Sequence, residues 1–579
     1  MQPVDYTTLM ASCSELRTNW LPARLEQVYQ RDRFTVSLAL RTLNRRGWLD
    51  ISWHPQAARL CVSSPPPRVP DTFTFSDQLR HQLGGLALVA IAEVSPWERV
   101  IDFQFAKRPG EPALWHLYVE IMSKYSNVIL AGKDNAIVTA AHQVSSQQSS
   151  VRPIQTGDRY ELPPRLTDPI PKLEEPLERW RERVSLIPGS VKKQLLKSYR
   201  GLSSSLAISM IEVAGLDQNC TTESLNNAEW ERLFQRWREW LHTLETEEFK
   251  PGRTQTGYTV TGWGKIGESP ATVQELLDEY YTEELNRQEF KQLRHQISQK
   301  LNTLLKKLGV KLQGFCDRLQ QSDDADLYRG QADLLMAHLH EWEPGMKAIK
   351  LADFETGEPV KIPLDPEKNA VQNAQSLYKR HQKLKRARVA IEPLMKAVKD
   401  EIDYLEQVEA AIAQTPTYQK PADLQTLKEI RGELIEEGYL SVPDYRKPAA
   451  GTETEFYRYR TPGGFELLVG RNNQQNDRLT SQVATDYDLW FHTQEIPGSH
   501  VLLRLPPGEV PDDTDLQFVA NVTAYYSRAR QSEQVPVIYT HPKHVYKPKG
   551  AKPGMVIYKH ERVLWGAPQQ AIQVLGLEV

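Results

Sequence analysis

Residues 464–504, GFELLVGRNNQQNDRLTSQVATDYDLWFHTQEIPGSHVLLR, decide how the C-terminal part of the chain folds. Apolar residues alternate over 464–470, which predicts a strand, and Gly470 ends it. Asn472 suits the N-cap of a following helix. Alternation returns over 488–492, and a Pro497-Gly498 turn leads into a third strand near His500. The segment therefore predicts a strand, a helix and a hairpin, in that order.

An amide-rich run lies between the first two strands. Five Asn or Gln residues in a row, after Gly-Arg and before an Asp, are more than capping requires, although polar helix starts are common. Such side chains can contact base edges, and the first N–H groups of a helix can hold a phosphate. We therefore expect RNA contacts from Arg471, Asn472, Asn473, Gln475, Asn476 and Asp477.

The two strands after this run carry an aromatic residue and two histidines. A period of two places Asp488, Trp490 and His492 on one face, and the hairpin brings His492 near His500. We expect Trp490, His492 and His500 to contact RNA. The alternatives are a core tryptophan and hydrogen-bonded sheet histidines. We expect no metal site, because no Cys or third ligand shows the required spacing.

The whole chain has the composition of an ordinary globular protein. Its 579 residues suffice for three or four domains, and its formal net charge of −3 means that any basic surface is local. Four scattered cysteines indicate a reducing compartment. Because neither a signal peptide nor an apolar span is recognisable, we expect a cytoplasmic protein with no membrane partner. The absence of a P-loop, a Ser-His-Asp order or a metal cluster predicts no cofactor and no catalytic site.

Periodicity divides the chain into four predicted regions of a multidomain α+β protein. Residues 1–170 form a β-rich N-terminal domain with strands near 34–40, 48–53, 86–95, 100–105, 114–121 and 126–130. Residues 171–270 are helical, and Gly201 suits a helix-hairpin-helix turn or a plain helical hairpin. Residues 271–445 form a long antiparallel coiled-coil arm with a small hairpin tip. A linker at 447–451 precedes the α/β C-terminal domain, 446–579.

Two basic segments predict contact with nucleic acid phosphates. The first is on the second helix of the arm, where 377–391 carry no acid, and its expected rRNA contacts are Lys379, Arg380, Lys383 and Arg386. A solvated helix face is the alternative. The second is the loop 541–560, with five lysines, three histidines and no acid. There we expect Lys547, Lys549 and Lys552 to follow RNA phosphates, unless the loop has no ligand.

Several stretches together resemble the NFACT family of RNA-binding proteins. They are VGRNNQQNDRLT, DLWFH, IPGSHV, YYSRARQSEQVPVIYT and VYKPKGAKPGMVIY, with LYVEIMSKYSNVIL of the N-terminal domain. The resemblance implies a ribosome-associated quality control factor that binds large subunits obstructed by peptidyl-tRNA and recruits tRNA, typically alanyl-tRNA, for mRNA-independent tailing. It also implies a small RNA-binding elongation partner of the RqcP type. Bond formation would be left to the ribosome.

The resemblance also assigns tRNA contacts in the N-terminal domain. The family's Asp-Arg pair falls on Glu98-Arg99, with Asp5 beside it, so Glu replaces Asp here. Two other classes of protein fit the sequence less well. A DNA glycosylase of similar domain order would need an N-terminal proline next to glutamate, whereas Gln2 precedes Pro3 here, so we expect no DNA partner. A surface fibronectin-binding adhesin would need export.

Overall fold

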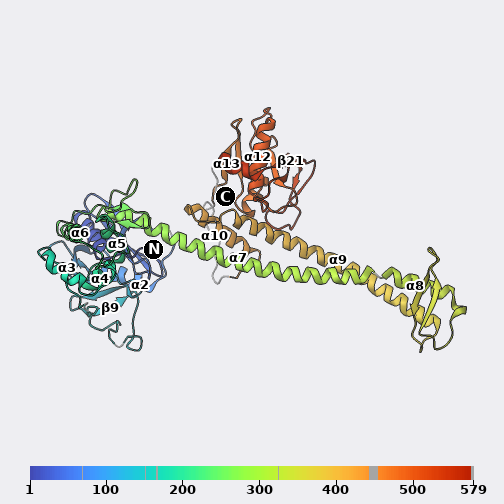
Figure 1. Cartoon of the computed structure of the whole chain (residues 1–579), viewed down its shortest axis with the longest axis horizontal. Coiled ribbons are helices and arrows are strands. Elements are labelled where there is room, and N and C mark those ends of the chain that lie inside the picture. The colour runs from blue at the N-terminus through green and yellow to red at the C-terminus, as the bar shows by residue number, and fades with distance from the viewer. Residues whose placement is uncertain (68, 150, 165–166, 324, 442–453, 576–579) are drawn as a thin grey trace. The chain divides into compact units, whose positions relative to one another are not determined.

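The computed structural model describes residues 1–579 except 68, 150, 165–166, 324, 442–453 and 576–579 (Figure 1). The described chain divides into two compact units, Met1–Leu285 and Asn286–Val579. The predicted linker at 447–451 and the predicted boundary at 445/446 lie outside the described residues.

A nine-stranded antiparallel sheet forms the body of the first unit. Its strand order is β4-β3-β2-β1-β5-β6-β7-β8-β9. Helices α1 and α2 pack on the sheet because Leu9, Leu16, Leu79 and Leu83 join its apolar core. The elements are α1 (Tyr6–Trp20), β1 (Ala23–Asp32), β2 (Thr35–Arg41), β3 (Arg46–Ser52), β4 (Arg59–Ser63), α2 (Thr74–Leu83), β5 (Ala87–Glu93), β6 (Val100–Ala106), β7 (Trp115–Glu120), η1 (Ser123–Tyr125), β8 (Asn127–Gly132) and β9 (Ile137–Ala140).

A small helical bundle completes the first unit. Its core contains four tryptophans, Trp180, Trp230, Trp237 and Trp240, whose large apolar area stabilises short helices that would be marginal alone. The elements are α3 (Leu177–Ser185), α4 (Val191–Ser198), α5 (Ser204–Val213), α6 (Asn227–Thr246), β10 (Gly252–Arg253) and β11 (Tyr258–Thr259).

Two long helices form the arm of the second unit, and the first of them begins at Val273, within the first unit (Figure 1). The early part of α7 (Val273–Asp323) packs on the late part of α9 (Ala370–Ala413), since Phe290, Ile297 and Leu301 share a core with Leu405 and Ile412. The helices are therefore antiparallel. At about 1.5 Å per residue, the 51-residue α7 is on the order of 75 Å long. The tip contains α8 (Ala325–Ala337), η2 (Leu339–Glu341), β12 (Ala348–Ala352) and β13 (Pro359–Pro363), and α10 (Pro421–Glu436) follows the arm.

The C-terminal domain is a six-stranded sheet of order β14-β15-β17-β16-β18-β21. Helix α12 covers one face, on which Leu489, Phe491 and Val501 are buried, and a second core with Leu479, Trp490 and Ile538 covers the other. The elements are β14 (Tyr457–Arg460), β15 (Glu466–Val469), α11 (Asn473–Arg478), η3 (Leu479–Val483), β16 (Leu489–Thr493), β17 (Val501–Leu503), α12 (Asp513–Tyr525), β18 (Val535–Thr540), η4 (Pro542–His544), β19 (Val545–Tyr546), β20 (Ile557–Tyr558), β21 (Arg562–Gly566) and α13 (Pro568–Leu575).

The mixed α/β class, the N-terminal sheet, the long helices and the C-terminal sheet domain are as predicted. Each strand expected in the N-terminal domain is present, but β1, β4 and β9 were not foreseen. The hairpin is also present, because Trp490 pairs with Leu502 and Phe491 with Val501. Helix α9 continues through Pro393.

Candidate nucleic-acid interface

The N-terminal candidates lie at the start of α1. Asp5 is the N-cap of this helix and accepts hydrogen bonds from Thr8 N at 2.8 Å and Ser203 Oγ at 2.6 Å. Its carboxylate is buried, but the residue also lines a cavity of about 620 Å³ shared with Thr8, Ser209 and Thr261. Asp5 therefore joins the start of α1 to the helical bundle and lies at the edge of a polar hollow.

Glu98 and Arg99 occupy the turn between β5 and β6. Glu98 pairs with Arg200 at 3.4 Å, and Arg99 Nη1 donates to the Val4 carbonyl at 3.2 Å. Burial lowers the pKa of Arg99, and the nearby carboxylates of Asp5 and Glu98 oppose this lowering. The three predicted side chains thus form one electrostatic cluster, although Glu98 already has a cationic partner.

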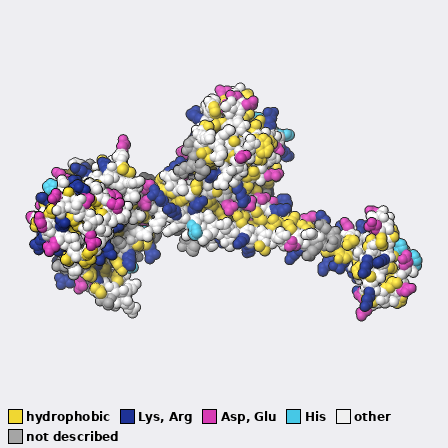
Figure 2. Space-filling view, in the orientation of Figure 1, with side chains coloured by type: hydrophobic (Ala, Val, Ile, Leu, Met, Phe, Trp, Pro, Cys, Tyr) yellow, Lys and Arg dark blue, Asp and Glu magenta, His cyan; other side chains and the backbone are white. Residues whose placement is uncertain are grey.

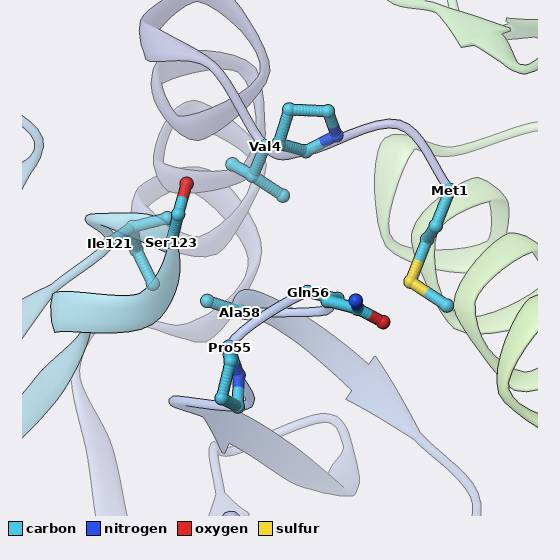
Figure 3. A pocket seen from close by; sticks show the side chains of 8 residues that line it. Met1, Val4, Pro55, Gln56, Ala58, Ile121 and Ser123 are labelled. Carbon is cyan, nitrogen blue, oxygen red and sulfur yellow. The ribbon is translucent and has the colours of Figure 1, made fainter.

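A smaller cavity lies next to this cluster (Figure 3). Its volume is about 290 Å³, and three segments surround it: the N-terminal segment with Met1 and Val4, the turn with Pro55 and Gln56, and the start of η1 with Ser123. Arg99 orients this wall, because it holds the Val4 carbonyl. The cluster is thus accompanied by hollows on its surface, as a binding site requires.

The amide run is buried against α10. Asn472 Nδ2 donates to Glu429 at 2.7 Å and Asn473 Nδ2 donates to Glu433 at 3.1 Å. Gln475 Nε2 donates to the Thr454 carbonyl at 2.9 Å. The prediction that these amides are open to RNA does not fit this structure, because Thr454 binds Gln475 and the acids of α10 cover Asn472 and Asn473. We call this contact the α10 interface.

The remaining residues of the run also have partners within the chain. Arg471 is buried, lies 3.8 Å from Asp423, and stacks on the Tyr457 ring at 3.9 Å. Asn476 Oδ1 accepts from His500 N at 3.0 Å. The prediction of RNA contact by Arg471 and Asn476 is corrected in the same way: these side chains stabilise the domain.

Trp490 belongs to the second core, and the rings of His492 and His500 lie beside it. Trp490 is 0% exposed, and its Nε1 donates to Thr480 at 3.1 Å. The rings of His492 and His500 are 5.5 Å apart, so the expected proximity is confirmed. Burial lowers the pKa of His492 to about 4 and that of His500 to about 3, so both are neutral at pH 7. Trp490 is therefore a core tryptophan and not an open base-stacking platform, and His500 is a hydrogen-bonded sheet histidine. His492 is partly buried and its Nε2 has no hydrogen-bond partner among the described residues, so its contact with RNA stays a prediction.

The predicted basic run on α9 is exposed. The cationic side chains that face solvent are Lys379, Arg380, Lys383, Lys385, Arg386 and Arg388. Figure 2 shows Lys and Arg side chains gathered on the arm beside the tip. Arg380 lies over the Tyr328 ring at 4.3 Å, and Arg388 pairs with Glu392 at 3.1 Å. The run is therefore accessible to a polyanion, and contact with rRNA stays a prediction.

The lysine loop, residues 541–560, is only partly available. Lys547 forms an ion pair with Asp477, and Lys552 pairs with Glu437 at 2.5 Å. Lys549 is exposed. Asp477 is therefore an internal partner of the loop, and its contact with RNA stays a prediction.

The sequence reasoning missed the acids on α10 and the residues around the base of the loop. Glu429 and Glu433 lie on one helix, four residues apart, and nothing local indicates that they pair with amides about forty residues away. His541, His544 and His560 were counted as part of a basic loop, but their convergence with Arg562 on a cavity was not foreseen. The pairing of β18 with β21, the pairing of β19 with β20, and the hydrogen bond from the Lys559 amide to the His544 carbonyl bring them together.

The fold and these surfaces define a class: a multidomain scaffold with exposed cationic side chains on an arm and on a C-terminal loop. Within the described ranges, no group of three or more His, Cys, Asp or Glu residues is placed to hold a metal ion. No helix in the described part of the chain is long and apolar enough to cross a membrane.

Comparison with known proteins gives the family. The family model described as NFACT N-terminal and middle domains matches residues 5–452, and the model described as NFACT protein RNA binding domain matches 455–560. The chain belongs to the NFACT family. It is 29% identical to the Rqc2 homolog RqcH of Bacillus subtilis (strain 168) and 30% identical to that of Streptococcus suis (strain 05ZYH33), each over 96% of both chains.

Two solved structures from Streptococcus suis resemble separate halves of the chain. The C-terminal part of the fibronectin/fibrinogen-binding protein is 31% identical, covers 49% of this chain and 98% of its own, and gives a TM-score of 0.38. The N-terminal part of that protein is 23% identical, covers 48% of this chain and 98% of its own, and gives a TM-score of 0.39. At these scores the likeness supports no conclusion about function.

Proposed function

We propose that this chain is a ribosome-associated quality control factor. It binds large ribosomal subunits obstructed by peptidyl-tRNA and recruits tRNA, typically alanyl-tRNA, so that a tail is added to the stalled nascent chain without mRNA. The observation that carries the proposal is the similarity over 96% of the chain to proteins named Rqc2 homolog RqcH, together with the match of residues 455–560 to an RNA-binding domain.

The proposed roles follow the charged clusters of each unit. Arg99, with Asp5 and Glu98, contacts tRNA beside the two hollows of the first unit. Lys379, Arg380, Lys383 and Arg386 contact rRNA along α9, where they face solvent. Such phosphate contacts supply affinity without sequence specificity. Peptide bond formation is left to the ribosome, and a small RNA-binding partner of the RqcP type assists.

The experiment that tests the proposal separates tRNA from subunit binding. The full-length chain is sedimented with purified large subunits, and RNA crosslinked to it in cells is sequenced. We expect cosedimentation at moderate salt and enrichment of one tRNA alongside large-subunit rRNA. Enrichment of mRNA or genomic DNA instead, or no cosedimentation, contradicts the proposal.

Arg99→Ala is the first prediction. Because Arg99 carries the cationic group of the cluster, its loss should lower the amount of crosslinked tRNA at least tenfold while leaving cosedimentation with large subunits intact. Arg108→Ala, at an exposed position beyond β6, is the matched control and should change neither quantity. Loss of both activities together would show that tRNA and subunit binding are not separate.

A further inference from the structure

A cavity of about 400 Å³ lies in the C-terminal domain where β16 and β21 begin and β18 ends. Its apolar wall contains Leu489, Leu505 and Leu516, and two tyrosines, Tyr487 and Tyr539, line it as well. Tyr487 is 56% exposed, so an aromatic face is open to solvent at this edge. The volume lies within the usual range of small-ligand sites, about 300–1,000 Å³.

Four side chains that are cationic or can become so line the same cavity: His541, His544, His560 and Arg562. The rings of His544 and His560 are 4.7 Å apart, because the Lys559 amide donates to the His544 carbonyl at 3.1 Å and holds the two strands of the loop together. His560 has a φ of 56°, a left-handed conformation that few non-glycine residues adopt and that is enriched at binding sites. We call this cavity the histidine pocket.

The cations of the lysine loop are distributed unequally around this pocket. Lys547 and Lys552 are neutralised by Asp477 and Glu437. Lys543 and Lys559, which adjoin His544 and His560 in sequence, are exposed. Within the described residues neither they nor Arg562 pairs with an acid, and Glu509 is the one acid among the residues that line the pocket. Two of the three unneutralised lysines of the loop, Lys543 and Lys559, therefore lie beside residues of the histidine pocket, and the third, Lys549, lies elsewhere on the loop.

The combination of walls and charges limits the class of ligand. A purely apolar ligand would gain nothing from Arg562 and the histidines, and a bare anion would gain nothing from the leucine wall. A nucleotide of single-stranded RNA satisfies both, because its base packs on tyrosine and apolar side chains and its phosphate is held by arginine and histidine. The domain also matches an RNA-binding family model, while its amide run and Trp490 are buried.

We propose that the histidine pocket binds one unpaired RNA nucleotide, with the base against Tyr487, Tyr539 and Leu489 and the phosphate against His544, His560 and Arg562. This inference rests on the proposed function and deepens it by naming the surface of the C-terminal domain that contacts RNA. Lys543 and Lys559 hold the phosphates on either side.

The test uses the full-length chain and a fluorescein-labelled single-stranded oligouridine of about ten nucleotides, with affinity measured by fluorescence anisotropy. Tyr487→Ala and Arg562→Ala should each weaken binding on the order of tenfold, since one stacking contact or one charged phosphate contact is lost. Tyr487→Phe should keep the wild-type affinity because it keeps the ring. Arg460→Ala removes the same charge from β14, at the opposite edge of the sheet, and should change affinity less than about twofold.

Two results would overturn the inference. One is unchanged affinity in both Tyr487→Ala and Arg562→Ala, and the other is complete competition by inorganic phosphate at matched ionic strength, which would indicate an anion site without a base. Cosedimentation of the same variants with large subunits separates this inference from the proposed function. Wild-type protein that cosediments and binds oligouridine, with pocket variants unaffected, refutes the pocket alone. Wild-type protein that does neither refutes the proposed function as well.

Discussion

Glu433 is the buried carboxyl group at the centre of the α10 interface. It accepts hydrogen bonds from Tyr404 Oη at 2.8 Å and from Asn473 Nδ2 at 3.1 Å. Burial raises the pKa of Glu433 to about 7, and the two hydrogen bonds oppose this rise. Because the folded state binds this proton more tightly than the unfolded state, the stability that it contributes is complete below about pH 4.5 and is lost as the pH rises through 7.

Glu433→Gln should remove this loss, since Gln accepts the same two hydrogen bonds without ionising. We expect the urea midpoint of the variant to lie close to that of the wild type at pH 5 and above it at pH 8. The difference at pH 8 should correspond to a free energy of unfolding that is higher by on the order of 1–3 kcal/mol. His492 and His500 titrate in the same way in both proteins, so their contribution cancels from the difference in stability between the variant and the wild type. Glu533→Gln, at an exposed position in the same unit, is the control and should leave both midpoints unchanged. A variant that is equally destabilised at both pH values would contradict the assignment.

At the scale of an element, the turn between α4 and α5 determines how the helical bundle meets the Glu98-Arg99 turn. Gly201 has a φ of 84°, and a Cβ there would lie 2.5 Å from the Trp97 ring. Trp97 in turn stacks on Tyr6 at 4.8 Å and precedes Glu98 in the chain. Position 201 therefore requires glycine for two reasons: the backbone is left-handed there, and the Trp97 ring approaches too closely for a Cβ.

Gly201→Ala should destabilise the first unit by about 1–3 kcal/mol more than Gly215→Ala. Gly215 has a φ of 75° with nothing within 4 Å of an added Cβ, so it carries the same backbone cost without the clash. Thermal denaturation of the full chain provides the comparison. Because Trp97 must move, tRNA crosslinking should also fall in Gly201→Ala, and equal effects of the two substitutions would show that the ring contact does not matter.

At the scale of the whole molecule, affinity for a polyanion must come from local surfaces, since the formal net charge is −3. The exposed run on α9 is the strongest such surface on the arm. Counterion release makes the logarithm of a phosphate-driven affinity fall linearly with the logarithm of the salt concentration.

Lys379→Glu combined with Lys383→Glu should weaken large-subunit association and reduce the salt slope by about two, one for each lost phosphate contact. Lys291→Glu combined with Lys300→Glu makes the same charge change at exposed positions on α7 and is the matched control. Sedimentation at several salt concentrations measures both slopes. Identical slopes for the two double variants would refute a specific role for the α9 run.

The sequence by itself determined which segments form most of the helices and strands. The alternation at 488–492 and the seventh-residue repeat through Val398, Leu405 and Ile412 are local patterns, and β16 and α9 follow them. The sequence also identified the basic run on α9, because a helical segment with many cations and no acid is expected to expose those cations on at least one side.

Only the tertiary structure decided which polar side chains are available to bind RNA. Asn472 and Asn473 are of a residue type that suits an RNA-contacting surface. Glu429 and Glu433, which are distant in the chain, nevertheless cover them. Conversely, His544 counted only as part of a basic loop and Arg562 was not singled out, yet the pairings of β18 with β21 and of β19 with β20 place both beside one cavity. The physical reason is that periodicity fixes the direction of a side chain relative to its own element, whereas exposure depends on which distant element packs against it.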